Sequence, residues 1–272
     1  MIIGISGKLQ NGKNTVGTII QYLSWCKLNS IIENKEHYTL FYNKQNYDKN
    51  VSSGWTQKAF ASKLKQCVSI ITGIPIEDLE KEEVKNKVLG EEWNVVDKVC
   101  NICGKNWNND PFNLFNLSNG KTYCSSCKNG IYLDSTKKIT VRKLLQLLGT
   151  EVGREIHPNF WVNALFADYK SNGNLAFERL DSSERLPLTN DPNDFMFPKW
   201  IITDVRFPNE LQAIKDKGGI VIRVDRPNLI ENNHLSETSL DSAIFDFVIN
   251  NDKDIEHLIN EVRKIFEKLS II

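Results

Sequence analysis

The feature that most constrains this chain is a glycine loop between a predicted strand and a predicted helix, close to the N-terminus. Residues 2–6 are apolar or small and predict a short buried strand. Residues 14–25 place apolar side chains at helical spacing. The loop between them reads Gly7-Lys8-Leu9-Gln10-Asn11-Gly12-Lys13. A strand, a tight loop and a helix in this order predict an α/β unit whose helix packs back onto its strand.

The glycine loop (residues 7–13) has the glycine-x4-glycine-lysine spacing of loops that bind phosphate. Its glycines let backbone N–H groups turn toward phosphate oxygens, Lys13 adds a positive charge, and the following helix points its positive end at the anion. The candidate nucleotide-binding residues are Gly7, Lys8, Asn11, Gly12, Lys13, Asn14 and Thr15. Asn14 stands where the pattern usually has a hydroxyl, and Thr15 comes one position later, which argues against direct magnesium coordination by that side chain. The competing interpretation is a glycine turn that only caps an ordinary strand–helix unit.

Strands and helices alternate toward both ends of the sequence. Apolar runs predict further strands at 200–203, 220–224 and 245–249. Apolar residues at helical spacing predict helices at 58–71, 76–89, 140–152, 159–169, 209–217 and 255–269. The polar stretch 29–54 predicts loops with one strand near 38–42. We expect a three-layer α/β fold with a mostly parallel sheet, and a ligand site at the carboxyl ends of its strands.

Two close pairs of cysteines interrupt this pattern. Cys100-x2-Cys103 and Cys124-x2-Cys127 are separated by 20 residues, which is close to the spacing of ribbons in which four thiolates hold one zinc ion. A closed shell of four thiolates leaves no catalytic water, so the expected role is structural. Two disulfides or unligated thiols are the alternatives. We expect a small zinc-ribbon insertion over 97–135, within a core formed by 1–96 and 136–272.

The overall charge excludes some classes of protein. With 34 Lys and Arg against 34 Asp and Glu, the chain does not favour a partner such as nucleic acid or an acidic membrane over its whole surface. It has no apolar run long enough to cross a bilayer, and its N-terminus carries no basic leader or cleavage site. We expect a cytoplasmic protein with a small-molecule substrate, and a homodimer is left open.

Several blocks of the sequence resemble, in order, the phage-type deoxynucleoside monophosphate kinases, which belong to the P-loop kinases. The blocks are Gly12-Lys13-Asn14-Thr15, Phe60-Ala61 with Leu64-Lys65, Arg142-x3-Gln146-x2-Gly149-Thr150-Glu151-x2-Arg154 with Trp161-Val162, Thr203-Asp204-Val205-Arg206-Phe207-Pro208-Asn209-Glu210, His234-x-Ser236-Glu237, and Asp246 with Ile249-Asn250-Asn251. They cover most of the chain outside 97–135. The resemblance implies a P-loop kinase fold and transfer of the γ-phosphoryl group of ATP, with Mg²⁺, to a deoxynucleoside monophosphate. A viral protein of this family would act in the cytoplasm of its host.

Residue types and the resemblance together suggest roles for these residues. Arg142 and Gln146 stand four apart on a predicted helix and share a face, where they could hold the acceptor's phosphate and its base. The substrate-binding set is completed by Arg154 and Trp161, and the catalytic set is Lys13, Asp204 and Arg206. Asp204 could hold magnesium through water or contact the acceptor, and Arg154 or Arg206 could stabilise charge on the transferred group. The competing structural roles are a turn cap for Asp204 and pairing of either arginine with Glu151 or Glu210.

Residues 170–199 have a loop-forming composition and are the candidate closing segment, with Arg179 and Arg185 inside it. An exposed surface loop is the alternative, and His234 receives no role. Two other functions remain in view. One is a zinc-ribbon protein that binds nucleic acid and is regulated by nucleotide, and the other is a P-loop kinase for another small acceptor such as dephospho-coenzyme A. The sequence does not select the preferred deoxynucleotide.

Overall fold

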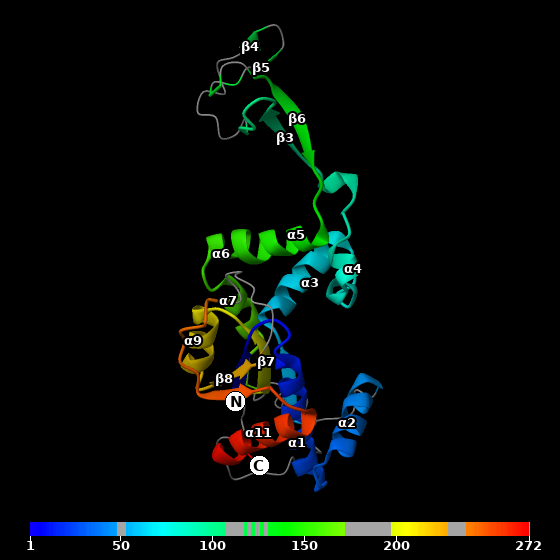
Figure 1. The fold of residues 1–272 in the computed structure, drawn as a ribbon, viewed down its shortest axis with the longest axis vertical. Coiled ribbons are helices and arrows are strands. Elements are labelled where there is room, and N and C mark those ends of the chain that lie inside the picture. Colours follow the sequence, from blue (N-terminus) through cyan, green and yellow to red (C-terminus); the bar gives the residue numbers. More distant parts are fainter. Residues whose placement is uncertain are drawn as a thin grey trace, which may run out of the picture. The chain divides into compact units, whose positions relative to one another are not determined.

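The structure is a computed structural model that describes most of the chain. The described residues are 1–47, 53–106, 117–118, 121–122, 124, 126–127, 130–171, 197–227 and 238–271. The chain forms two compact units (Figure 1), which are residues 1–64 with 153–272 (the first unit) and residues 65–152 (the second unit). These bounds differ from those of the predicted domains, because residues 65–96 and 136–152 group with the segment that carries the cysteine pairs.

Five strands form the sheet of the first unit. Their order is β2 (Trp55–Lys58), β7 (Lys199–Val205), β1 (Ile2–Ser6), β8 (Ile220–Asp225) and β9 (Phe247–Asn250). Every neighbouring pair in this sheet runs parallel. β1 lies in the middle, and each of its residues is buried, which explains why its sequence is apolar or small throughout. The prediction of a mostly parallel sheet is confirmed.

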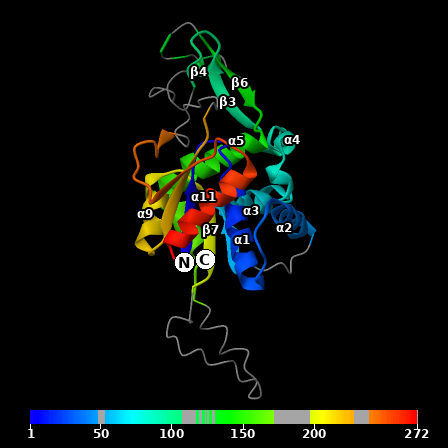
Figure 2. The same ribbon diagram turned by 60° about the horizontal axis from the view of Figure 1, so that its bottom comes forward.

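Helices cover both faces of this sheet and complete the three predicted layers. The covering helices are α1 (Lys13–Asn29) and α11 (Ile255–Lys268) on one face, and α7 (Phe160–Phe166) and α9 (Pro208–Asp216) on the other. Figures 1 and 2 show α1 and α11 side by side. Successive strand residues point to opposite faces, so Ile3 and Ile5 join the cluster with α1 and α11, whereas Ile2 joins the cluster with α9.

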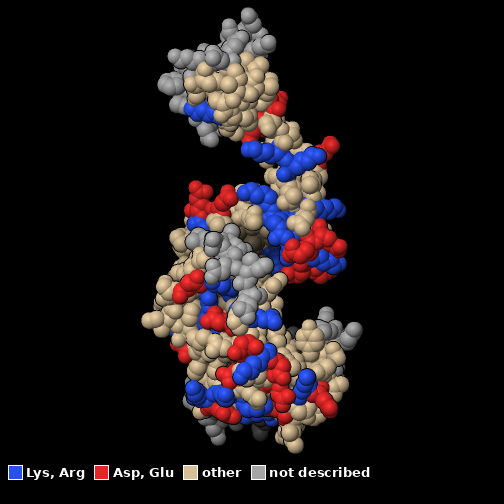
Figure 3. Space-filling view, in the orientation of Figure 1, with Lys and Arg blue, Asp and Glu red and all other residues tan. Residues whose placement is uncertain are grey.

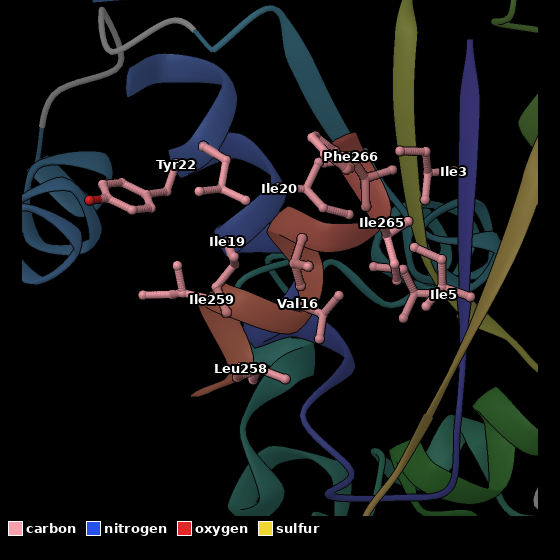
Figure 4. Packing of buried hydrophobic residues seen from close by; sticks show 14 of the residues in the cluster. Ile3, Ile5, Val16, Ile19, Ile20, Tyr22, Leu258, Ile259, Ile265 and Phe266 are labelled. Atoms are coloured by element: carbon pink, nitrogen blue, oxygen red, sulfur yellow. The ribbon is translucent and has the colours of Figure 1, made fainter. Parts of the chain in front are cut away.

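α1 is positioned by its apolar face. Val16, Ile19 and Ile20 are fully buried in one cluster with residues of the sheet and of α11 (Figure 4). Burying a side chain of this size contributes roughly 1.5–3 kcal/mol. The helix ends at Ser30, whose left-handed backbone (φ 53°) lets its N–H donate to carbonyls of the last turn. This packing fixes the start of α1, and with it the glycine loop, at the carboxyl edge of β1.

One prediction of the sequence is wrong. A helix, α2 (Lys35–Tyr47), lies where we expected loops with a strand near 38–42. Tyr38 and Phe41 stand three residues apart on this helix, and their rings pack on that of Tyr22, with ring centroids 5.4 and 5.7 Å apart. The burial of two aromatic rings stabilises a helix whose other residues are mostly polar and give little periodic signal.

The other predicted helices are present with changed bounds. The helix predicted at 58–71 is α3 (Phe60–Thr72), that at 76–89 is split into a 3₁₀ turn η1 (Asp78–Glu80) and α4 (Glu82–Lys85), and that at 140–152 is α5 (Val141–Gln146) followed by a π-helical stretch η4 (Leu147–Val152) and α6 (Gly153–Ile156). The split at 76–89 falls at Lys81, which has an extended backbone with ψ 130°.

The second unit contains two small antiparallel sheets. One sheet pairs β3 (Val95–Cys100) with β6 (Tyr132–Lys137), and the other pairs β4 (Leu117–Ser118) with β5 (Lys121–Thr122). The 3₁₀ turn η2 (Glu91–Trp93) precedes β3. Cys100, Cys124 and Tyr132 form a small buried cluster beside β3 and β6, and Cys127 packs against it. Cysteines therefore make up most of this cluster.

Charged side chains of both signs mix on the surface. On the face shown in Figure 3, the described part of the first unit carries blue and red side chains interspersed, without a broad field of one sign. This agrees with the formal net charge of zero. Among the described residues, no helix combines the length and the apolar character that crossing a membrane requires.

Candidate active site at the glycine loop

The glycine loop (residues 7–13) turns sharply between β1 and α1, and both of its glycines are required by their surroundings. Gly7 and Gly12 have φ values of 150° and 93°, a region that L-residues rarely adopt. A Cβ atom on Gly7 would lie 2.4 Å from the carbonyl oxygen of Val224, and one on Gly12 would lie 2.6 Å from Nδ2 of Asn251. The glycine spacing thus follows from close approaches to the ends of neighbouring strands.

Lys13 is the first residue of α1, and its ammonium group lies across the loop. Its Nζ donates to the carbonyl oxygens of Gly7 and Lys8, both at 2.6 Å. The first turn of α1 carries no acidic residue, and the N-cap residue, Gly12, has no side chain that could cap the N–H groups of this turn. Backbone N–H groups at such an end are available to an anion. Asn14 is exposed and Thr15 half-buried, so the two side chains predicted beside the lysine reach the surface.

Charged side chains form a series of ion pairs from the glycine loop to β8, which sequence reasoning missed. Lys8 Nζ lies 3.7 Å from Asp241 Oδ2, and Arg223 Nη2 donates to Oδ1 of the same carboxylate at 3.3 Å. Arg223 Nε also donates to Asp225 Oδ1 at 2.9 Å. Arg223 is buried in β8, and a charged residue in an otherwise apolar strand is the signal that could have identified it.

Asp204 binds the start of a helix distant in sequence. Its Oδ1 accepts a hydrogen bond from the N–H of Phe60 at 2.8 Å, and its Oδ2 accepts one from the N–H of Ala61 at 2.9 Å. These N–H groups belong to the first turn of α3, where a carboxylate satisfies donors that have no partner within the helix. The structure thus gives Asp204 a capping role at the start of α3.

Arg154 and Arg206 meet at the buried carboxylate of Glu210. Arg154 Nη2 lies 3.3 Å from Glu210 Oε1, and the backbone N–H groups of Arg206 and Phe207 donate to Oε2 at 2.8 and 3.1 Å. The guanidinium carbon of Arg154 lies 3.8 Å from the centre of the Phe207 ring. Burial, together with the charge of Asp204, raises the pKa of Glu210 to about 7, although the N–H donors and Arg154 oppose the rise.

Trp161 lies in the first turn of α7, and its ring packs edge-on against that of Phe160, with centroids 4.9 Å apart. The side chain of Asn209 donates to the carbonyl oxygen of Pro158 at 3.0 Å and to Oδ1 of Asn159 at 2.9 Å. These bonds join α9 to the start of α7. The segment that carries Trp161 is therefore fixed to the helix that carries Glu210.

Arg142 and Gln146 lie one turn apart on α5, in the second unit, as their spacing predicted. Arg142 Nε donates to Asn86 Oδ1 at 3.1 Å, and its Nη2 forms an ion pair with Glu82. Hydrogen bonds from Lys85 and then Arg142 lower the pKa of the exposed Glu82 carboxyl. Glu151 pairs with Lys143 at 3.5 Å, so it is not the partner of Arg154.

The four cysteines of the two pairs converge in the second unit. Their Sγ atoms all lie within 4.8 Å of one another, with 3.6 Å between Cys100 and Cys127 and 3.5 Å between Cys103 and Cys124. These distances are far longer than a disulfide bond, and the thiols are free. The N–H of Gly130 donates to Cys127 Sγ at 3.3 Å, and a Cβ at Gly130 would lie 2.2 Å from Cys100 Sγ. The chain is thus shaped to bring four sulfurs together.

Some predicted features lie outside the described residues. They are Arg179 and Arg185 with residues 172–196 of the candidate closing segment, and the block at His234, Ser236 and Glu237. The closing segment stays a prediction.

Comparison with known proteins identifies the family of this chain. A family model described as deoxynucleotide monophosphate kinase matches residues 1–262. The chain belongs to this family. A protein of Acanthamoeba polyphaga mimivirus, provisionally named a deoxynucleotide monophosphate kinase, is 29% identical over 151 residues, which are 55% of this chain and 72% of that protein.

Two phage proteins are more distant members of the deoxynucleotide monophosphate kinase family. The deoxynucleotide monophosphate kinase of Enterobacteria phage T4 is 26% identical over 132 residues, 48% of this chain and 46% of that protein. The deoxynucleoside-5'-monophosphate kinase of Escherichia phage T5 is 23% identical over 262 residues, 88% of this chain and 85% of that protein. The resemblance found in the sequence is confirmed by these matches.

Proposed function

We propose that this protein transfers the γ-phosphoryl group of ATP to a deoxynucleoside monophosphate. An oxygen of the acceptor's phosphate attacks the γ-phosphorus, the bond from the γ-phosphorus to the oxygen shared with the β-phosphate breaks, and ADP and a deoxynucleoside diphosphate leave. The observation that carries the proposal is the geometry of the glycine loop in a chain of this family. The reaction needs no nucleophile from the protein, because alignment and charge neutralisation supply most of the catalysis.

ATP would bind at the glycine loop. Gly7, Lys8, Asn11, Gly12, Lys13, Asn14 and Thr15 form its binding set in this proposal. Lys13 already bonds to two oxygen acceptors of the loop, and phosphate oxygens can take their place. The open N-terminus of α1 adds donors with a favourable dipole. We expect these donors to raise the affinity for the triphosphate and to stabilise the charge that develops on it during transfer.

Magnesium would accompany the ATP. Oxygen donors suit this ion, and it usually keeps several water ligands besides substrate phosphates. The Asp204 carboxylate and the Thr15 hydroxyl supply oxygens of this kind. Each oxygen of Asp204 accepts one N–H from α3, and a carboxylate oxygen can accept a second hydrogen bond, so contact through water suits its position. The ion would neutralise charge on the phosphates as the γ-phosphoryl group moves.

Arginines would hold the phosphates of both substrates. The Nε atom of Arg154 is buried and has no hydrogen-bond partner among the described residues, which supports contact with an anion. Arg206 lies in the same cluster, and we assign it to the transferred group. Arg142 and Gln146 would hold the acceptor, with Trp161 completing the substrate-binding set. A planar guanidinium suits phosphate, because it donates two parallel hydrogen bonds.

The second unit would hold one structural Zn²⁺ through Cys100, Cys103, Cys124 and Cys127. A tetrahedral zinc ion with Zn–S bonds of about 2.3 Å places its sulfurs roughly 3.8 Å apart. The measured separations of 3.5 and 3.6 Å approach this value. The N–H of Gly130, which donates to Cys127 Sγ, would orient this sulfur toward the ion, as hydrogen bonds to ligand atoms do in other metal sites. We place the whole protein in the cytoplasm, that of a host cell if it is viral.

The test is release of ADP from ATP and Mg²⁺ with each deoxy- and ribonucleoside monophosphate in turn, and with dephospho-coenzyme A. The Lys13→Ala protein serves as the blank, and we expect its kcat to be about 100- to 1,000-fold lower. Turnover with one or a few deoxynucleotides supports the proposal and names the substrate. Folded protein without acceptor-dependent turnover would contradict it. Salt-dependent DNA binding in such a protein would instead favour the nucleic-acid-binding alternative.

A further inference from the structure

Asn251 connects the glycine loop to the end of β9, an edge strand of the sheet. It directly follows β9, and its backbone N–H donates to the carbonyl oxygen of Asp225, at the end of β8, at 2.7 Å. Its side-chain Nδ2 donates to the backbone carbonyl oxygen of Asn11, in the glycine loop, at 2.9 Å. The amide of Asn251 is thus fixed to the sheet at its backbone and to the loop at its side chain.

The loop is held at Asn11 from a second direction. Asn11 is 3% exposed, and its Nδ2 donates to the carbonyl oxygen of Val224 at 2.7 Å. The next residue, Gly12, leaves the space that the side chain of Asn251 occupies, since a Cβ there would lie 2.6 Å from Nδ2. The buried side-chain amide of Asn11 and the half-buried side-chain amide of Asn251 therefore hold this part of the loop against the ends of β8 and β9.

Fixing this carbonyl also fixes the direction of a hydrogen-bond donor. The carbonyl of Asn11 and the N–H of Gly12 belong to one planar trans peptide, so they point in opposite directions. Because Asn251 holds the carbonyl oxygen, the N–H of Gly12 points away from Asn251. Without that bond, the peptide could rotate and offer a carbonyl oxygen where a phosphate needs an N–H donor.

We propose that Asn251 is a positioning residue that holds the glycine loop in the shape that binds the phosphates of ATP. This inference rests on the proposed function, because it takes ATP as the occupant of the loop. Asn251 acts through the Asn11–Gly12 peptide and touches no reacting atom. Its effect should therefore fall on ATP and spare the deoxynucleotide, which the proposal assigns to other side chains.

The neighbouring residue provides a matched control. Asn250 is the last residue of β9, pairs with Asp225 in the strand register, and is exposed. Asn250→Ala removes the same amide group one position away without touching the loop. A general effect of shortening an asparagine at this strand end would appear in both variants, whereas a clamp on the loop would appear only in Asn251→Ala.

The experiment measures binding of MgATP, and separately of the four common deoxynucleoside monophosphates, by calorimetry, with the melting temperature of each protein. We expect Asn251→Ala to weaken the binding of MgATP about three- to tenfold, through the loss of one partly buried hydrogen bond. Deoxynucleotide binding should change less than twofold, and Asn250→Ala should match the unmodified protein. Asn251→Asp keeps the shape, but it turns an oxygen toward the Asn11 carbonyl and adds negative charge, so it should weaken MgATP further.

The outcomes separate this inference from the function on which it rests. If the unmodified protein binds MgATP and both Asn251 variants bind it equally well, the inference is wrong and the proposed function stands. Equal losses for ATP and the deoxynucleotide, or equal losses in the Asn250 and Asn251 variants, would also overturn it. An unmodified, folded protein that does not bind MgATP would overturn the proposed function and the inference together.

Discussion

The first unit and the β3–β6 part of the second unit differ in what they bury. The first unit buries two clusters of aliphatic and aromatic residues, one on each face of its sheet. Beside β3 and β6, the second unit has a small cluster of Cys100, Cys124 and Tyr132, while Val96 and Leu133 on these strands are exposed. A segment of only about 40 residues usually buries too little apolar surface to fold without a metal ion, disulfides or a partner chain. The comparison teaches that hydrophobic burial can hold the sheet, whereas β3 and β6, which we call the hairpin, bury little apolar surface, so we expect its order to depend on the four cysteines.

The strongest test of this difference is removal of the metal ligands. Replacing both Cys100 and Cys103 with Ser should abolish zinc binding and the order of the β3–β6 hairpin, because structural zinc contributes on the order of 10 kcal/mol. Metal analysis and amide hydrogen exchange would report both losses, with amides of β1 and β8 unchanged. The control is Cys67→Ser, since Cys67 is exposed and outside the cluster. A hairpin that stays protected without metal would contradict the comparison.

The converse test removes apolar volume from the first unit. Ile19 is fully buried between the sheet and α11, so Ile19→Ala should lower the free energy of unfolding of this unit by about 2–5 kcal/mol. Leu133→Ala on β6 should change stability by less than about 0.5 kcal/mol, because Leu133 is 51% exposed. Chemical denaturation of both variants gives the answer. Similar losses at the two positions would show that the hairpin has an apolar core after all.

A third test compares the two units by the substrate that each one binds. In our proposal the glycine loop of the first unit binds ATP, and Arg142 of the second unit binds the acceptor. Arg142→Ala should raise the KM for the deoxynucleotide roughly 10- to 100-fold, the loss of a charge-assisted hydrogen bond, and leave the KM for ATP unchanged. Glu82→Gln removes the ion-pair partner of Arg142 and should leave both values nearly unchanged. Equal effects of the two substitutions would point to a structural role for Arg142.

The smallest expected effect is the pH dependence of the stability of the first unit, which we attribute to Glu210. The pKa of Glu210 is about 7 in the folded protein, above its value in the unfolded chain, so the folded state binds more protons between these two values. Stability should therefore fall as pH rises from about 4.5 to 7 and then level off, by roughly 1–3 kcal/mol. Glu210→Gln should remove this slope, which urea unfolding at pH 5 and 7.5 would detect. Asp216→Asn, an exposed change on the same helix, should keep it.

Much of the fold could be predicted because the sheet is buried on both faces. Such strands are continuous apolar runs, and the glycine loop marks the first junction between strand and helix. α2 escaped prediction because its helical character depends on Tyr22, a residue of another helix. One local signal was present, since Asn34 accepts a hydrogen bond from the N–H of His37 as helix caps do.

The candidate site could be predicted where chemistry is local in sequence. The spacing of Gly7, Gly12 and Lys13 was sufficient for the loop, whereas Asp204 bonds to N–H groups about 144 residues away, a contact that no local pattern reveals. Asn251 is a similar case, because its bond to Asn11 spans 240 residues. Contacts of this kind follow from the parallel sheet, which places the ends of distant strands at one edge.

The position of β1 has a consequence for how the chain folds during synthesis. β1 is made first, yet it pairs with β7 and β8, which are made only when residues 199–225 have been added. At a synthesis rate of about 5–20 residues per second, this strand waits roughly 10–45 s for its neighbours. The second unit is one continuous stretch, residues 65–152, so all four of its clustered cysteines are available in that interval. The sheet is complete only after β9 has been made, so the apolar, unpaired β1 must be shielded from aggregation until these later strands are available.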